Sequence, residues 1–517
     1  MDKNFSEQHT MKYAFNLCCR LNADKELIVE PAARYTGAVL NQEARSFARA
    51  LDSFRVEKGE VVALLGTSSC RFYAAYFAAH KLGAVTCNLH YRESAHYIGE
   101  VLRQIEAKVL VCSESMLELA MGAVKTLPHA VPVISLGDTA PAGIAGAYGE
   151  CIDRFPAEEP VVDVSPEDPA VIILSSGSTG APKGIVHSNW NYVRWIHATP
   201  TLFGPISRST RYLIIVGTSF AAWAFSSITV VMAGGTIVIE QAFVPERFCR
   251  LIEEERISAF GTVPTVIRVL EPAITDGYDF SSVKMVLCAG ESPSEQDIQR
   301  IRSWGDCDIR CLYLASETAN ATACYWELAD LVDHGKPVCA GKPVPGTDIR
   351  IINPNGGIDD ELPCGEKGEI AFRGPTIALG YLKNEALTAE RFVNGWWRSG
   401  DMGHFDQDGY LFVSGRTDNM INSGGIKVYG EEIENCLLSH PEVAMAAVIG
   451  VANPQWGQRI EAHLVCMQDV AEDELDQHCR ERLASFKCPK RYVFHAELPL
   501  GVTGKLDRVA LRKMASG

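Results

Sequence analysis

Short apolar runs alternate with helix-length segments through the first half of the chain. The runs are rich in β-branched residues and include Val61–Leu65, Val109–Cys112 and Val131–Leu136. This alternation is typical of βαβ units, in which a helix connects neighbouring parallel strands. The chain shows no internal repeat of about 20 to 50 residues, so a solenoid is excluded. The pattern therefore predicts an α/β fold with largely parallel sheets.

One stretch of 27 residues, from Leu213 to Ile239, carries no charged side chain and has the length of a membrane-crossing helix. Three glycines, at positions 217, 234 and 235, interrupt it together with several serines and threonines. Residues of this kind divide a long apolar segment into shorter elements. We therefore expect a buried strand, a helix and a second strand inside a core, and no integral membrane association.

The second half of the chain has a different pattern. Turn-forming glycines and prolines recur between Gly335 and Gly374, which predicts a β-rich subdomain. After Asp418 the pattern changes to a helix around Glu431–Glu434, followed by further strands and another helix. These changes predict two domains, which are a large one of residues 1–417 and a small α+β one of residues 418–517.

Charge and cysteine content exclude some classes of protein. The 517 residues include 48 lysines and arginines against 64 aspartates and glutamates, a formal net charge of −16. This balance argues against a general binder of nucleic acid or of anionic membranes, although it says nothing about local basic pockets. The 17 cysteines show no C-x-x-C spacing, and residues 1–9 contain no apolar core of a secretory signal. We therefore expect a cytoplasmic protein with reduced cysteines.

The segment Ser175–Gly184 reads SSGSTGAPKG and combines three glycines, four hydroxyl residues and one lysine. Its glycines let backbone N–H groups turn toward an anion, while the hydroxyls and Lys183 add donors and charge. The spacing differs from G-x-x-x-x-G-K-[ST], because Pro182 precedes Lys183 and Gly184 follows it. An ordinary P-loop nucleoside triphosphatase is disfavoured. From this segment alone, a phosphate-gripping loop and a plain flexible surface loop both stay open.

Four further motifs follow this loop along the chain. They are Tyr313–Glu317 (YLASE), Arg398–Asp401 (RSGD), Gly415–Asp418 (GRTD) and Thr503–Lys505 (TGK). In this order the five motifs resemble those of the adenylate-forming superfamily, which includes acyl-CoA synthetases, peptide-synthetase adenylation domains and luciferases. The resemblance implies a large N-terminal domain of parallel-sheet αβ subdomains with a β-rich subdomain. It also implies a small, mobile α+β C-terminal domain that turns about a hinge at Asp418.

The resemblance assigns the glycine-rich loop to ATP. The residues that would hold the β- and γ-phosphates are Ser176, Gly177, Ser178, Thr179, Gly180 and Lys183. It further implies that Glu317 binds Mg²⁺ and that Ser316 contacts phosphate, and a hard cation prefers oxygen ligands of this kind. Without the other motifs, Glu317 would be interpreted as a solvated surface residue.

Adenosine is implied to lie against other motifs. Tyr313 would stack on adenine, and the base edge would be contacted by Gly290, Glu291 and Ser292. Asp401 can accept hydrogen bonds from two ribose hydroxyls, and Arg416 can reach ribose or phosphate. Taken alone, Tyr313 could equally be a core aromatic residue and Asp401 a helix cap. His187, just after the loop, is interpreted as a structural hydrogen-bonding group rather than a base.

The late motif and the small domain are implied to divide two half-reactions. Lys505 would serve adenylation, because a cation at the α-phosphate stabilises the charge that builds in the transition state. For the second half-reaction the small domain would rotate about Asp418 and bring Asn422–Val428 to the same site. Gly424 and Gly425 would then leave a tunnel for a slim thiol arm, although a simple tight turn explains the same two residues.

The residues expected to line the acyl pocket are aromatic or small, and they are Phe220, Ala221, Trp223, Phe225, Leu312 and Asn320. Ala221 stands where amino-acid-activating relatives carry an aspartate that pairs with the ammonium group, so an α-amino acid substrate is disfavoured. Aromatic and small apolar walls favour an aryl or compact hydrophobic acid. The segment also departs from the family, because the usual gating histidine has no counterpart around Val216–Phe225.

The motifs together predict an ATP- and Mg²⁺-dependent acid–CoA ligase. A small-molecule carboxylic acid and ATP would give acyl-AMP and pyrophosphate, and coenzyme A would then displace AMP to give acyl-CoA. Two alternatives stay open: a stand-alone adenylation enzyme that loads a separate carrier protein, and a non-catalytic nucleotide-binding homologue. We expect a monomer or a homodimer.

Overall fold

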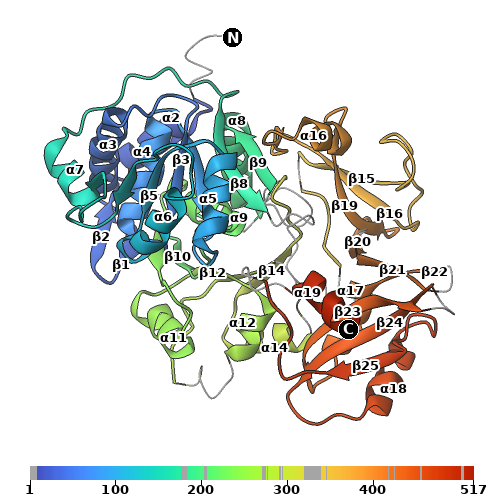
Figure 1. Ribbon diagram of the computed structural model, residues 1–517. Helices are drawn as coiled ribbons and strands as arrows, with labels where there is room; N and C mark the ends of the chain where they lie inside the picture. Colours follow the sequence, from blue (N-terminus) through green and yellow to red (C-terminus); the bar gives the residue numbers. More distant parts are fainter. Residues whose placement is uncertain are drawn as a thin grey trace. The chain divides into compact units, whose positions relative to one another are not determined.

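The chain divides into two units, and Figure 1 shows their secondary structure in a computed structural model. Unit 1 comprises Met1–Ile349 and Phe372–Trp397, and unit 2 comprises Arg350–Ala371 and Arg398–Gly517. The structure describes residues 8–175, 183–202, 206–270, 275, 277–289, 293, 295–318, 339–344, 346–416, 419–423, 426–453, 457–501 and 506–516.

The first sheet of unit 1 has the strand order β17-β9-β8-β4-β3-β5-β6-β7. Neighbours from β8 to β7 are parallel, whereas β9 and β17 add antiparallel pairs at one edge. The strands are β3 (Val61–Leu65), β4 (Val85–Leu89), β5 (Ala107–Cys112), β6 (Val133–Ser135), β7 (Gly146–Ala147), β8 (Pro169–Ser175), β9 (Lys183–Ser188) and β17 (Gly380–Tyr381). The three apolar runs of the sequence form β3, β5 and β6, so the predicted parallel arrangement is confirmed.

Strand β3 shows why these runs are apolar throughout. Val62 and Leu64 belong to one hydrophobic cluster with residues of α3 and α4, while Ala63 and Leu65 belong to another with residues of α5 and α6. A strand with a buried residue on each face needs no polar alternation. The helices of this part are α3 (Gly37–Ser53), α4 (Cys70–Lys81), α5 (Ala95–Gln104), η1 (Glu114–Met116), α6 (Leu117–Val124), α7 (Tyr148–Arg154) and α8 (Asn189–Leu202).

The second sheet of unit 1 has the order β14-β13-β12-β10-β11-β1-β2, and all neighbours except β1 and β2 are parallel. Its strands are β1 (Glu26–Glu30), β2 (Ala33–Thr36), β10 (Arg211–Ile214), β11 (Thr236–Ile239), β12 (Ala259–Thr262), β13 (Met285–Ala289) and β14 (Asp308–Leu312). The helices that accompany it include α2 (Met11–Leu21), α11 (Pro245–Glu254), α12 (Pro264–Val269) and α14 (Glu295–Ser303).

The uncharged stretch from Leu213 to Ile239 forms a strand, a helical segment and a second strand, as predicted. Strands β10 and β11 pair in parallel, and the chain between them is helical through α9 (Ala221–Trp223), the π-helical η2 (Ala224–Ile228) and α10 (Thr229–Met232). Among the helices that the structure describes, none is long and apolar enough to span a bilayer.

A smaller sheet with the order β22-β21-β24-β23, to which β25 pairs along β24, lies within unit 2. Its core joins Ile421, Val448 and Leu464 of the sheet to Ile433 and Leu475 of two helices. The strands are β21 (Met420–Ser423), β22 (Ile426–Tyr429), β23 (Val443–Asn453), β24 (Gly457–Cys466) and β25 (Arg491–Phe494), and the helices are α17 (Gly430–Leu438), α18 (Glu472–Arg482) and α19 (Arg508–Ser516).

A fourth sheet takes its first two strands from the turn-rich segment of the sequence, and it has the order β15-β16-β19-β18 with β20 paired to β19. These elements are β15 (Asp348–Ile352), β16 (Gly368–Arg373), α16 (Glu385–Arg391), β18 (Phe392–Val393), β19 (Trp396–Phe405) and β20 (Leu411–Arg416). The predicted α/β class, β-rich part and separate α+β C-terminal part are thus confirmed. The boundary at Asp418 stays a prediction, since that residue lies outside the described residues.

Candidate active site

The glycine-rich segment connects two antiparallel strands of the first sheet. Ser175 at the end of β8 pairs with Lys183 at the start of β9, and Leu174 pairs with Gly184. The chain therefore returns along the same sheet after the loop, whereas a P-loop is followed by a helix. Residues 176–182, which include Ser176, Gly177, Ser178, Thr179 and Gly180, lie outside the described residues, so their phosphate contacts stay predictions.

Two predicted adenosine contacts follow neighbouring strand ends in the second sheet. Strands β13 and β14 are parallel, and Ala289 at the end of β13 pairs with Leu312 at the end of β14. Tyr313 comes directly after Leu312, and its ring lies 5.7 Å from the ring of Phe372. Ligands of open α/β sheets bind outside the carboxyl ends of the strands. The segment Gly290, Glu291 and Ser292 follows β13 but is outside the described residues.

A tyrosine that the sequence did not single out contacts two charged residues of the candidate site, Glu317 and Lys183. The Tyr381 hydroxyl donates a hydrogen bond of 2.9 Å to Glu317 Oε1, and the Lys183 ammonium lies 5.8 Å from the centroid of the Tyr381 ring. Burial and the nearby Glu317 carboxylate raise the pKa of Tyr381, so its phenol stays protonated and donates. No sequence pattern separates this residue from the other tyrosines of the chain.

The backbone on either side of Glu317 is tied to the same sheet. His187 of β9 lies within hydrogen-bonding distance of the Ser316 carbonyl, with 2.8 Å between Nε2 and the oxygen. Burial lowers the pKa of His187 to about 4, so the ring is neutral near pH 7 and Nε2 donates to the carbonyl. This contact supports the structural interpretation of His187. In addition, Ala378 N donates to Glu317 O over 2.8 Å.

The predicted acyl-pocket residues occupy two different environments. Phe220 and Ala221 are half-buried after β10, and the Phe220 ring meets the edge of His90 at 5.4 Å. Trp223 is fully buried and donates from Nε1 to Ser68 Oγ over 2.9 Å, while Phe225 packs against Trp195. Trp223 and Phe225 therefore also serve the core that supports this segment. Their contact with an acyl group stays a prediction, as do those of Leu312 and of Asn320, which is not among the described residues.

In unit 2, a buried glutamate holds the motif Arg398–Asp401 in place. Glu369, which is 5% exposed, accepts hydrogen bonds of 3.0 Å from Arg398 Nε and from the backbone N–H of Gly400. Gly400 has φ +75°, a conformation that a side chain disfavours. Glutamate and glycine together fix the backbone of β19 immediately before Asp401.

Asp401 and Arg416 lie opposite each other on β19 and β20. They are cross-strand partners, and Arg416 Nε is 3.6 Å from Asp401 Oδ1, which is an ion-pair distance rather than a hydrogen bond. The Asp401 side chain is 14% exposed and that of Arg416 is 53% exposed. The structure thus brings together Asp401, which the sequence assigned to ribose, and Arg416, which it assigned to ribose or phosphate.

The segments that flank the predicted thiol tunnel and the predicted catalytic lysine are described, although the sites themselves are not. Ser423 and Ile426 pair across the two residues Gly424 and Gly425, and Leu500 pairs with Leu506 across the segment that contains Lys505. These pairings define where each segment leaves and re-enters regular structure. The roles of Gly424, Gly425, Lys505 and the hinge residue Asp418 stay predictions.

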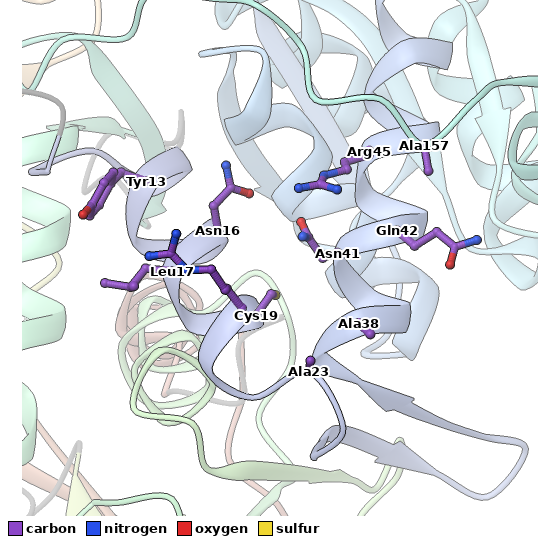
Figure 2. Close-up of a pocket in the computed structure, with 11 residues that line it drawn as sticks. Tyr13, Asn16, Leu17, Cys19, Ala23, Ala38, Asn41, Gln42, Arg45 and Ala157 are labelled. Atoms are coloured by element: carbon purple, nitrogen blue, oxygen red, sulfur yellow. The ribbon is translucent and has the colours of Figure 1, made fainter.

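A hollow of about 610 Å³ lies elsewhere in unit 1, between α2 and α3 (Figure 2). Polar side chains such as Asn16, Asn41 and Arg45 line it. None of the residues that the sequence assigned to ATP or to the acyl group belongs to this lining. The hollow therefore adds nothing to the candidate active site.

Comparisons with known proteins agree with the order of the motifs. The pattern of a family described as "AMP-binding enzyme" matches residues 16–382, and that of "AMP-binding enzyme C-terminal domain" matches residues 432–505. The 2-succinylbenzoate–CoA ligase of Bacillus licheniformis is 31% identical over 94% of this chain and 96% of its own. The fatty acid–[acyl-carrier-protein] ligase ScoC of Streptomyces coeruleorubidus is 30% identical over 92% and 90%.

A solved structure supports the same relationship. The anthranilate CoA ligase AuaEII, in complex with anthranoyl-AMP, superposes with a TM-score of 0.88 at 25% identity, covering 98% of this chain and 97% of that one. The agreement extends over the large and the small parts of the fold.

Proposed function

Because the chain belongs to the AMP-binding enzyme family, we propose that it activates a carboxylic acid with ATP and Mg²⁺ and passes the acyl group to coenzyme A. The resemblance to the adenylate-forming superfamily is confirmed, and the chain is an AMP-forming acid–thiol ligase. The carboxylate attacks the α-phosphate to give acyl-AMP and pyrophosphate. The thiolate of coenzyme A then attacks the acyl carbon and AMP leaves.

The observation that carries the proposal in atomic terms is the cluster of Lys183, Tyr381 and Glu317 at the end of the glycine-rich hairpin. Lys183 would bind the leaving pyrophosphate as a point charge, and Ser316 would add a donor. Glu317 offers carboxylate oxygens, which are the ligands that Mg²⁺ takes alongside phosphate oxygens and water. Bound Mg²⁺ would offset the negative charge of the phosphates.

The available ligands, which are the Glu317 carboxylate and the phosphates of the substrate, fit magnesium better than a structural metal ion. Within the ranges that the structure describes, no group of three or more His, Cys, Asp or Glu side chains is placed to hold a metal ion. Magnesium in nucleotide sites is commonly held by one or two carboxylates together with phosphates of the substrate. A single glutamate beside a phosphate loop matches that pattern.

The remaining steps fall to residues of unit 2. Asp401 would accept hydrogen bonds from the ribose hydroxyls, with Arg416 held beside it by the ion pair. Lys505 would place its ammonium group at the α-phosphate and the attacking carboxylate during adenylation. Gly424 and Gly425 would admit the thiol arm after the small domain turns about Asp418.

We infer an aryl or compact hydrophobic acid as the substrate. The half-buried Phe220 and Ala221 offer an aromatic and a small apolar surface, and Ala221 cannot pair with an ammonium group. Two of the compared proteins, named for 2-succinylbenzoate and anthranilate, act on aromatic acids. Their names favour this class without naming the acid used by this chain.

The first alternative is transfer to the thiol of a separate carrier protein. One relative, ScoC, is named as a ligase of fatty acid to an acyl carrier protein. The distinction lies in the acceptor, since both routes share acyl-AMP formation. A cytoplasmic location and a monomeric or dimeric state stay predictions from the sequence.

The test is pyrophosphate release from ATP and Mg²⁺ with a panel of aryl, short, medium and long-chain acids, each with and without coenzyme A. We expect release with one acid class, together with thioester formation when coenzyme A is present. Acid-dependent release without consumption of coenzyme A would favour a carrier protein as acceptor. No release with any acid would contradict the proposal.

A further inference from the structure

We propose that Tyr381 is a positioning residue for magnesium-dependent nucleotide binding, in which its hydroxyl group orients the Glu317 carboxylate while its ring supports the Lys183 ammonium. The inference rests on the proposed function, because it concerns the same ATP site. Tyr381 belongs to none of the five sequence motifs, and it reaches the site from β17, which lies 64 residues after Glu317 along the chain.

The hydroxyl acts on the direction of the carboxylate. It donates to Glu317 Oε1 over 2.9 Å, a good length for a hydrogen bond to an ionised oxygen. A carboxylate has about four acceptor positions on two oxygens, and the Tyr381 bond at Oε1 orients the group while occupying one of them. A hydroxyl donor, unlike a lysine or arginine, brings no positive charge that would compete with Mg²⁺ for the carboxylate.

The ring and backbone hold this donor in place. Trp397 Nε1 donates to the Tyr381 hydroxyl oxygen over 3.3 Å, and the Phe392 ring meets the Tyr381 ring edge-on at 5.5 Å. Tyr381 pairs with Ile185 across β17 and β9, only two residues beyond Lys183. The segment that carries Tyr381 is therefore fixed to the strand that begins with Lys183.

The same segment is also fixed to Glu317. Leu382 N donates to Gly184 O over 2.7 Å on one side, and Ala378 N donates to Glu317 O over 2.8 Å on the other. Residues 378–382 thus connect the backbone of the glycine-rich hairpin to that of Glu317. A shift of either one would disturb the hydroxyl contact.

This arrangement predicts an effect that depends on the metal. Outer partners that orient metal ligands are typically worth about 10–100-fold in metal affinity. Removing only the hydroxyl should therefore weaken binding of ATP with Mg²⁺ and spare binding of metal-free ATP. The ring of a phenylalanine would still lie beneath Lys183, so the cation–π contact would persist.

The experiment compares wild type, Tyr381→Phe and Tyr148→Phe by isothermal titration calorimetry with ATP, once with excess Mg²⁺ and once with EDTA. Tyr148 is a matched control, because its buried hydroxyl also donates to a carboxylate, Glu43 Oε2, over 2.7 Å. We expect Tyr381→Phe to raise the Kd of Mg-ATP about tenfold and to leave that of metal-free ATP within about twofold. Tyr148→Phe should match wild type in both.

Two results would overturn the inference. One is an unchanged Kd of Mg-ATP in Tyr381→Phe, and the other is an equal loss with and without metal, which indicates general damage. If Tyr381→Phe does not fold, Trp397→Phe removes the donor that holds the phenol and should give a smaller loss of the same metal-dependent kind. A wild-type chain that binds no ATP would contradict the proposed function as well, whereas normal wild-type binding with an unaffected variant contradicts only this inference.

Discussion

Two carboxylates assigned to the nucleotide have different partners in the two units. In unit 1, Glu317 accepts a hydrogen bond from the neutral phenol of Tyr381. In unit 2, Asp401 lies 3.6 Å from the guanidinium of Arg416. A hydroxyl donor orients a carboxylate and adds no positive charge beside it, which suits a metal ligand, whereas a carboxylate beside a guanidinium suits neutral donors such as hydroxyl groups. We therefore expect the two acids to take different ligands, a metal ion at Glu317 and the ribose hydroxyl groups at Asp401.

The supports of the two acids differ as well. Glu317 is held by one segment more than 60 residues later in the chain, through Ala378 N and the Tyr381 hydroxyl. Asp401 is held through the residues just before it, because Glu369 of β16 accepts hydrogen bonds from both Arg398 and Gly400 of β19. We therefore expect substitutions around Glu317 to alter metal dependence and those around Asp401 to alter selection of the sugar.

The largest expected effect is on acyl-AMP formation. It tests whether unit 2 supplies a cation that stabilises the transition state as well as a contact to the sugar. Lys505→Ala should lower acyl-AMP formation about 100–1000-fold, because a charge aimed at the transition state is lost. Thioester formation from supplied acyl-AMP should stay within a few-fold of wild type. Pyrophosphate release and thioester formation are measured separately, and an equal loss of both would contradict the assignment of Lys505 to the first half-reaction.

Removing the charge of Glu317 tests the metal side of the comparison. Glu317→Gln should lower pyrophosphate release about 100-fold at limiting Mg²⁺, since an amide is a much weaker ligand for a hard cation. The Mg²⁺ concentration needed for half-maximal release should rise. Asp401→Asn is the control. An equal shift of the Mg²⁺ dependence in Asp401→Asn would contradict the assignment of the metal to Glu317.

Removing Asp401 tests the sugar side. Asp401→Ala should raise the apparent Kd of ATP about 10–100-fold. Hydrogen bonds to a charged group are worth about 1.5–3 kcal/mol, which corresponds to a change in Kd of this size. The variant should also lose the preference for ATP over 2′-deoxy-ATP and 3′-deoxy-ATP, measured by competition binding. A preference that survives in Asp401→Ala would remove Asp401 from the ribose contact.

The effect that is smallest near pH 7 concerns the stability of unit 1 and its dependence on pH. The pKa of buried His187 is lowered to about 4 from its ordinary value of about 6.5, so the unfolded chain binds a proton more readily between these values. The contribution of His187 to the free energy of unfolding is therefore constant above about pH 6.5. It falls by up to about 1.4 kcal/mol per pH unit as the pH is lowered toward 4.

We expect His187→Gln to reduce this slope, measured by urea unfolding at pH 7.0, 5.5 and 4.5. Burial also lowers the pKa of His80, to about 3, so part of the slope should persist in the variant. An unchanged slope would mean that His187 does not open to solvent in the measured transition.

The sequence predicted the fold wherever the chemistry of neighbours along the chain decides it. The apolar runs of β3, β5 and β6 are continuous because both faces of the sheet are covered. The glycines within Leu213–Ile239 indicated that one strand ends near Gly217 and that another begins after Gly235, where β10 and β11 are found. The unusual π-helical turn between them, Ala224–Ile228, has no periodic signal that distinguishes it from an α-helix.

The site was predicted in part for the same reason. Lys183, Glu317 and Asp401 were singled out as candidates because each belongs to a short, distinctive string of residues, and their roles stay predictions. Tyr381 and Glu369 were missed, since their partners lie 64 and 31 residues away and depend on which strands pair. Strand pairing of this kind is set by tertiary packing, which a single sequence does not reveal.

The pairing of β17 with β9 carries a consequence for how this chain could vary over evolution. Tyr381 faces Glu317 only while Gly380 stays opposite Val186 and Tyr381 opposite Ile185. Successive side chains of a strand point to opposite faces, so one inserted or deleted residue ahead of Gly380 would present a different side chain to the glutamate. We expect descendants of this chain to keep the length of this short segment while they exchange residues freely at exposed positions such as Leu379, which is 51% exposed.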